Sequence, residues 1–98
     1  MVIVGGAVHG SSAAWWLTGA DPSLRVAVIE PDATYQKSAT ALSVASVRSQ
    51  FSNPVNVEIS RFGVEFIRDF ARHIPDGGVP SLGLKENGYL FLSGTEAG

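Results

Sequence analysis

The fold is decided by residues 2–10, which read Val2-Ile3-Val4-Gly5-Gly6-Ala7-Val8-His9-Gly10. The β-branched run predicts a buried parallel strand that stops at the first glycine. The residues after it match the dinucleotide-binding pattern G-x-G-x-x-G, except that Ala7 replaces the second glycine. Residues 2–10 therefore predict a strand, a tight turn and the start of a helix.

Each glycine of this pattern has its own mechanical role. The first makes the turn, the second lets the backbone approach a pyrophosphate, and the third lets the helix pack against the strand. Ala7 adds one methyl group at the closest approach, which a small shift of the phosphate could accommodate. The helix N-terminus still offers free N–H groups and a positive dipole end. We expect the backbone of residues 5–10 to bind the ligand.

A second strand follows the predicted helix. The helix is predicted from Gly10 to Thr18, where the small residues 11–14 lead into residues 15–17, and Gly19 is its expected C-cap. A turn at residues 21–23 precedes Arg25–Ile29, which has the composition of another buried strand. Strand, helix and strand make a βαβ unit, so we predict an α/β fold that begins a Rossmann-like domain.

Glu30 ends the second predicted strand about twenty residues after the glycine turn, where this type of site places an acid. Its carboxylate can accept hydrogen bonds from both ribose hydroxyls and would repel a 2′-phosphate. NADP is therefore disfavoured. A solvated acid at a strand end is the alternative interpretation, and the glycine turn favours the ribose role.

The second half of the chain has a different architecture. Residues 34–52 form a hydroxyl-rich stretch without periodicity, which predicts an extended loop. Asn53 is a suitable N-cap with Pro54 at the first helical position. Apolar residues recur at helical spacing, and Pro75 and Gly77-Gly78 are expected to end this helix. The apolar positions are Val55, Ile59, Phe62, Phe66 and Phe70.

The last predicted element is a β-hairpin. Leu82–Glu86 and Tyr89–Ser93 flank Asn87-Gly88, a strong two-residue hairpin signal. We expect two domains: residues 1–52 as the N-terminal part of a nucleotide-binding domain, and residues 53–98 as a helix and hairpin that begin a substrate domain. A doubly wound domain needs several parallel strands, and two are visible. We therefore expect an incomplete domain that needs further C-terminal sequence.

Composition limits the classes of function. The chain is 45% hydrophobic and 16% charged, as in globular proteins, and its net charge of -2 argues against nucleic acid or an anionic membrane as partner. No stretch is long and apolar enough to span a bilayer. The absence of cysteine excludes disulfides and thiolate sites. His9 and His73 are isolated and predict no metal site. We expect a cytoplasmic location.

The sequence resembles the D-amino-acid-oxidase-type FAD oxidoreductases, which include glycine oxidases, sarcosine oxidases and dimethylglycine dehydrogenases. The resemblance runs nearly end to end. It rests on Val2–Gly10, Val28–Glu30, residues 38–48, Gln50–Ser52 and Leu84–Leu92. In that family the loop after the second strand passes beside the flavin, often as small residues followed by Ile-Arg. Here Ala45-Ser46 stand for the usual glycines and Val47-Arg48 for that pair.

Some members of that family attach the flavin covalently through a histidine in this region. Because no histidine lies between His9 and His73 here, the resemblance implies noncovalent FAD. It places Arg48 near the isoalloxazine ring, where a cation could stabilise negative charge on reduced flavin; a surface arginine is the alternative. Beyond the glycine turn, the expected FAD-contacting residues are Glu30, Pro31, Ser38, Ala39, Thr40, Ser43, Val44, Ala45, Ser46 and Arg48.

The family's reaction passes a hydride from the carbon beside an amine to flavin N5. The resemblance therefore implies an amine or amino-acid substrate, with dioxygen or an electron-transfer protein as electron acceptor. The sequence assigns no catalytic residue. Two alternatives stay open: an NAD-binding Rossmann protein, which needs neither the hydroxyl-rich loop nor Arg48, and a noncatalytic remnant that binds no cofactor.

Overall fold

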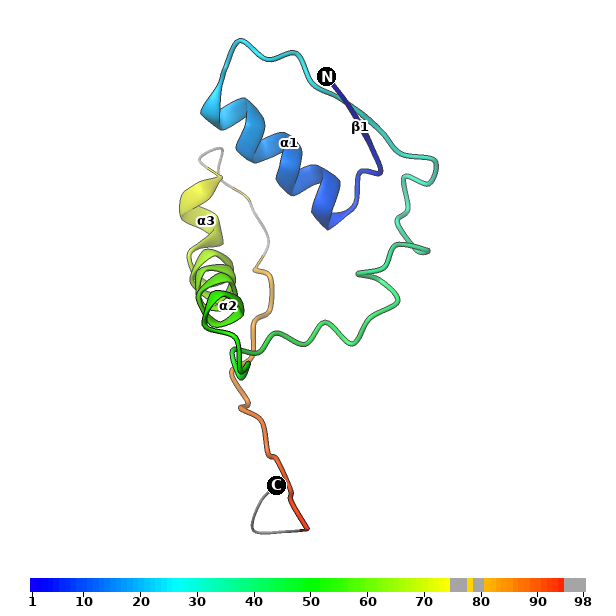
Figure 1. The fold of residues 1–98 in the computed structure, drawn as a ribbon. Coiled ribbons are helices and arrows are strands. Elements are labelled where there is room, and N and C mark those ends of the chain that lie inside the picture. Colours follow the sequence, from blue (N-terminus) through cyan, green and yellow to red (C-terminus); the bar gives the residue numbers. More distant parts are fainter. Residues whose placement is uncertain (75–77, 79–80, 95–98) are drawn as a thin grey trace. The chain divides into compact units, whose positions relative to one another are not determined.

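The computed structural model describes residues 1–74, 78 and 81–94, in two units, Met1–Ser46 and Val47–Gly98. The division lies ahead of the domain boundary expected between Ser52 and Asn53, which stays a prediction. Figure 1 shows the elements in chain order. The first unit holds β1 (Val2–Val4), α1 (Val8–Ala20) and β2 (Ala27–Ile29), and the second holds α2 (Pro54–Arg68) and α3 (Phe70–His73).

The first unit is the predicted βαβ arrangement. β1 and β2 pair in parallel, with Val2 opposite Ala27 and Val4 opposite Ile29. Helix α1 packs against both strands and runs beside β1 in Figure 1. The α/β class and the βαβ start are therefore confirmed. The second strand is shorter than predicted, because Arg25 contributes only its carbonyl oxygen, to the Met1 ammonium at 2.8 Å.

The boundaries of α1 differ from the prediction at both ends. The helix begins at Val8 rather than Gly10, and Gly19 lies inside it rather than at its C-cap. Asp21 is the C-cap, and its N–H donates to the carbonyl oxygen of Leu17 at 3.0 Å. The Asp21 carboxylate accepts the Ser23 N–H at 2.9 Å, a local turn that ends the helix without a glycine.

The strands are more exposed than the sequence predicted. Val4 is 85% exposed and Ile29 is 56% exposed. A single helix can cover only one face of a two-stranded sheet, so the apolar side chains elsewhere on it stay open. Gly6 is the one buried residue in the described part of the chain. The tightest packing of the first unit is thus at the glycine turn.

Helix α2 begins as predicted. The Asn53 side-chain oxygen accepts the Val55 N–H at 2.9 Å, and Pro54 occupies the first turn. The ring centroids of Phe62 and Phe66 lie 6.2 Å apart, so these two of the predicted apolar positions share one face. The helical run is interrupted at Asp69, between α2 and α3. Of the residues expected to end it, Pro75 and Gly77 lie outside the described residues.

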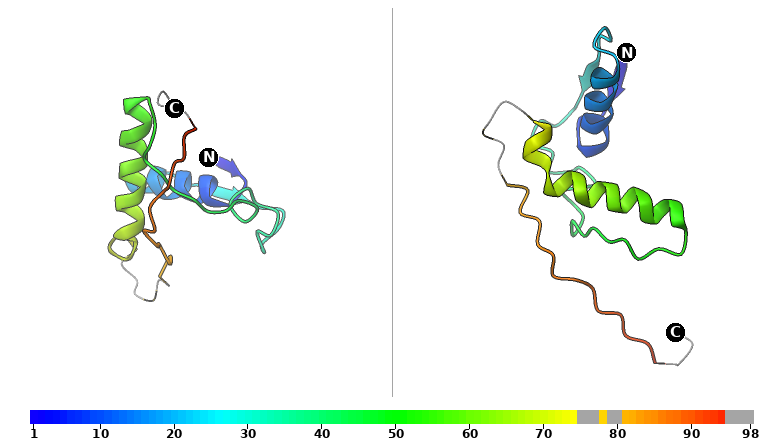
Figure 2. Two further views of the ribbon diagram at one scale, coloured as in Figure 1. Left: turned by 90° about the horizontal axis from the view of Figure 1, so that it is seen from below. Right: turned by 90° about the vertical axis from the view of Figure 1, so that its left-hand side faces the viewer.

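The predicted C-terminal hairpin is wrong. Residues 81–94 contain no strand and follow a single extended path, which Figure 2 shows from two sides. The two-residue turn expected at Asn87-Gly88 needs positive φ at both positions, and of these two only Gly88 has it, at +75°. A two-stranded hairpin alone is only marginally stable, so local turn chemistry was not sufficient.

Candidate nucleotide-binding site

The turn after β1 depends on Gly5. Its φ of +93° lies in a region that residues with a side chain rarely adopt, so glycine is required there. The Gly5 N–H donates to the carbonyl oxygen of Ile29 at 2.8 Å, which joins the turn to β2. The first glycine of the motif therefore makes the turn, as the sequence predicted.

Gly10 allows α1 to approach the end of β1. A Cβ atom at this position would lie 1.7 Å from the Gly5 carbonyl oxygen and 3.2 Å from a methyl carbon of Ile3. No side chain can occupy that space. The third glycine of the motif is therefore fixed by the close packing of helix on strand, the role that the pattern assigns to it.

Ala7 is the N-cap of α1 and is not strained. Its φ of -67° and ψ of -168° are extended backbone that any residue adopts. The first bond of the helical ladder runs from the Ser11 N–H to the Ala7 carbonyl oxygen at 2.9 Å. The N–H groups of Val8, His9 and Gly10 precede that ladder and point out of the helix end, as anion-binding amides do.

Glu30 is held beside this turn by two backbone amides. Its Oε2 accepts the Gly6 N–H at 2.7 Å, and its Oε1 accepts the Asp32 N–H at 3.0 Å. A carboxylate has about four lone-pair sites, so each oxygen keeps room for another donor. The carboxylate is thus fixed in place and can still accept hydrogen bonds from ribose hydroxyls.

Glu30 and Ala7, which alone among residues 5–10 does so, border a hollow of about 560 Å³ in the first unit. Five of the residues expected to contact FAD line it together: Ala7, Glu30, Pro31, Ser38 and Ala39. Three lining residues were missed by the sequence analysis: Asp32, Tyr35 and Lys37. The spacing of Asp32 and Thr34 is the signal that could have indicated a turn here.

Asp32 shapes the rim of this hollow through that turn. Its Oδ1 accepts the Thr34 hydroxyl at 2.6 Å and the Thr34 N–H at 3.0 Å. Both bonds lower the pKa of Asp32 below its ordinary value, and the bond from the Thr34 hydroxyl has the larger effect. The carboxylates of Glu30 and Asp32 and the ammonium of Lys37 are thus the charged groups that line the hollow.

The rest of the hydroxyl-rich loop is a series of turns. The Ser38 hydroxyl accepts the Ala41 N–H at 3.1 Å, and the Ser43 hydroxyl donates to the Thr40 carbonyl at 2.9 Å. Ala45 has a φ of +51°, in the left-handed region that favours glycine. Thr40, Ser43, Val44, Ala45 and Ser46 do not line the hollow, and their contact with a flavin stays a prediction.

Arg48 belongs to the second unit. Its guanidinium carbon lies 5.8 Å from the centroid of the Tyr89 ring, and the Tyr89 hydroxyl donates to the Val47 carbonyl oxygen at 3.0 Å. These contacts attach the start of the second unit to its extended C-terminal segment. The predicted position of Arg48 beside a flavin stays a prediction.

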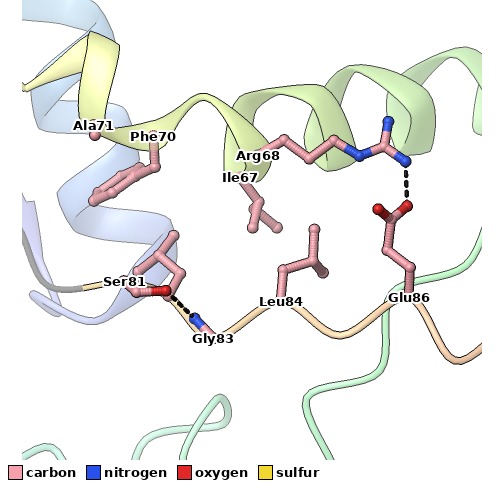
Figure 3. Close-up of a pocket in the computed structure, with 9 residues that line it drawn as sticks. Ile67, Arg68, Phe70, Ala71, Ser81, Gly83, Leu84 and Glu86 are labelled. Carbon is pink, nitrogen blue, oxygen red and sulfur yellow. Dashed lines mark hydrogen bonds and ion pairs between the residues drawn. The ribbon is translucent and has the colours of Figure 1, made fainter.

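The second unit has a hollow of its own, of about 490 Å³, between the end of the helical run and residues 81–86. Figure 3 shows Arg68 of α2 paired with Glu86 across it, with Ile67 and Leu84 facing each other beside that pair. The Glu86 carboxylate raises the pKa of Arg68, first by the hydrogen bond and then by its charge. No residue predicted to contact FAD lines this hollow.

Metal-binding chemistry finds no support in the described residues, which contain no cluster of three candidate ligands. His9 is exposed in the first turn of α1. His73 lies at the end of α3, with its ring stacked on Phe66 at 4.4 Å between centroids. No helix in the described part of the chain is long and apolar enough to cross a membrane.

Comparisons with known proteins show the family of this chain. A protein family described as FAD dependent oxidoreductase matches residues 1–98. The curated relatives include FAD-dependent oxidoreductase domain-containing protein 1 of Bos taurus, 43% identical over 98% of this chain, and of Xenopus laevis, 39% identical over 98%. The homologue of that protein in Drosophila melanogaster is 41% identical over 98% of this chain.

The chain spans about a fifth of the length of these relatives, 21%, 20% and 18% respectively. The matched stretch is the N-terminal portion of the longer proteins. No solved structure matches the chain.

Proposed function

Because this chain belongs to the FAD dependent oxidoreductase family, as its resemblance indicated, we propose that its first unit binds the adenosine diphosphate half of FAD. The observation that carries the proposal is the anchored carboxylate of Glu30. It is fixed by the Gly6 and Asp32 amides at the mouth of a glycine turn, and it retains acceptor capacity for ribose hydroxyls.

The residues present fit this half of the cofactor. The amides of Val8, His9 and Gly10, which precede the helical ladder, and the positive end of α1 suit a diphosphate. Glu30 suits the ribose, and the methyl group of Ala7 is the single departure from the motif. Since the Ala7 backbone is unstrained, the departure affects only the local space available to the phosphate.

We extend the proposal to the reaction of the whole protein: oxidation of an amine or amino acid, with dioxygen or an electron-transfer protein as acceptor. The flavin ring, when bound, supplies the hydride acceptor. Arg48 would hold positive charge beside the ring and so favour its reduced form. The support is the resemblance of residues 38–48 to the flavin-contacting loop of amine-oxidising relatives, and noncovalent attachment is proposed on the same basis.

The role of the Glu30 carboxylate is tested with the Glu30→Gln variant of the full chain. FAD affinity is measured by quenching of flavin fluorescence. Loss of a charge-assisted hydrogen bond costs about 1.5–3 kcal/mol, so we expect at least about tenfold weaker binding. The matched control is Glu58→Gln, because Glu58 is an exposed residue of α2 that pairs only loosely with Arg61, at 3.5 Å. Equal FAD affinity in Glu30→Gln and wild type would contradict the assignment.

The substrate class needs a separate measurement. Amines, amino acids and hydroxy acids are added without oxygen to the FAD-loaded protein, and the loss of flavin absorbance is followed. The proposal predicts bleaching by an amine or amino acid. Bleaching by hydroxy acids alone would leave the FAD site intact and refute the amine reaction.

A further inference from the structure

Tyr35 has a backbone conformation that is rare for an aromatic residue. Its φ is +56°, in the left-handed region. Two turns hold it there: the Tyr35 N–H donates to the Asp32 carbonyl at 2.9 Å, and the Ser38 N–H donates to the Tyr35 carbonyl at 2.9 Å. Strained residues of this kind persist where the surrounding structure fixes them, and they concentrate at ligand sites.

This conformation places the Tyr35 side chain on the glycine turn. A Cβ atom built on Gly6 would lie 3.1 Å from the Tyr35 hydroxyl oxygen and 3.2 Å from the Glu30 Cβ. Tyr35 and Glu30 therefore touch the same buried glycine. Both side chains also line the hollow that we assign to the nucleotide.

The Tyr35 hydroxyl makes no hydrogen bond to any other residue in the described ranges. A phenol can donate one hydrogen bond and accept others. Since this hydroxyl lies next to the ribose-binding acid and the diphosphate-binding turn, a nucleotide held there would come within its reach.

We propose that Tyr35 is a binding residue of this site, whose hydroxyl hydrogen-bonds the adenosine diphosphate half of FAD beside Glu30. The proposal rests on the function proposed above and adds a residue that the glycine motif does not contain. Tyr35 would act on the adenosine half alone, so its contribution should be the same for FAD and for free ADP.

The test is Tyr35→Phe in the full chain, with the dissociation constants of FAD and ADP measured by calorimetry. Loss of one hydrogen bond predicts about threefold to tenfold weaker binding of both ligands, by the same factor. The control is Tyr89→Phe. Tyr89 is the other tyrosine of the chain and lies in the second unit, so loss of its hydroxyl should leave ADP affinity unchanged.

A second variant separates ring from hydroxyl. Asparagine tolerates the left-handed conformation, so Tyr35→Asn keeps the turn, removes the ring and should weaken ADP binding more than Tyr35→Phe does. Helical circular dichroism reports whether each variant is folded. Wild-type ADP affinity in Tyr35→Phe, or a loss confined to FAD, would overturn the inference while leaving the FAD site standing. A wild-type protein that binds neither ligand, either as this chain or joined to the sequence that continues it, would overturn both.

Discussion

At Gly10 a single missing side chain determines how α1 meets β1. A methyl group there would lie 1.7 Å from the Gly5 carbonyl oxygen, so Gly10→Ala must push the helix away from the strand. We expect a loss of about 3 kcal/mol in the free energy of unfolding, the upper end of overpacking costs. Urea unfolding followed by circular dichroism measures it.

Gly19 provides the matched control on the same helix. Nothing lies within 4 Å of a Cβ atom at this position, and α1 continues past it. Gly19→Ala should therefore stabilise the chain by about 0.5–1 kcal/mol through helix propensity. A Gly10→Ala variant that is as stable as Gly19→Ala would show that the helix does not pack on the strand as described.

Ala7 is where the chain departs from the glycine motif. Ala7→Gly removes the one methyl group at the diphosphate turn, and glycine is also a better N-cap than alanine. We expect FAD to bind several-fold more tightly and the helix to lose no stability. Unchanged binding in a fluorescence titration would favour the interpretation that the turn is a remnant without a ligand.

Residue-scale prediction from the sequence succeeded where the constraint is local. The roles of Gly5 and Gly10 follow from the spacing of the motif, because turn and helix packing are set within a few residues. Tyr35 could not be found in this way. Its position depends on a left-handed backbone that tyrosine itself disfavours and that the neighbouring turns impose.

At the scale of elements, α2 depends on its N-cap. The Asn53 side chain satisfies the Val55 N–H, and Asn53→Ala leaves that amide without its partner. We expect a cost of about 1 kcal/mol, visible as reduced helical signal and a lower unfolding midpoint. Asn56→Ala, a change of the same chemistry inside α2, should not reduce helicity, and an equal loss in both variants would contradict the capping role.

Helix α2 could be predicted from the sequence, and the structure of residues 82–93 could not. Helix α2 carries its own cap, first-turn proline and apolar face, so short-range sequence sufficed. The hairpin predicted at residues 82–93 has a suitable turn dipeptide, but paired strands need neighbours that stabilise them. Turn composition alone could not decide whether those neighbours are present.

At the scale of the whole molecule, the residues that the sequence resemblance groups around a flavin belong to two different units. The glycine turn, Glu30 and the hydroxyl-rich loop up to Ser46 lie in the first unit, and Arg48 lies in the second. The sequence resemblance grouped all of them around one flavin. Motif spacing and helical periodicity act within one unit, so they cannot define how residues of two units come together around a flavin.

The central claim is that this chain contributes an FAD site, and a flavin absorbance spectrum tests it most directly. The chain is purified alone and together with the sequence that continues it in its natural context, mixed with FAD and separated from free ligand by gel filtration. We predict flavin bands that co-elute with the protein in the natural context and weaken in Glu30→Gln. Protein without flavin bands in both forms would contradict the claim and leave NAD binding or a noncatalytic remnant.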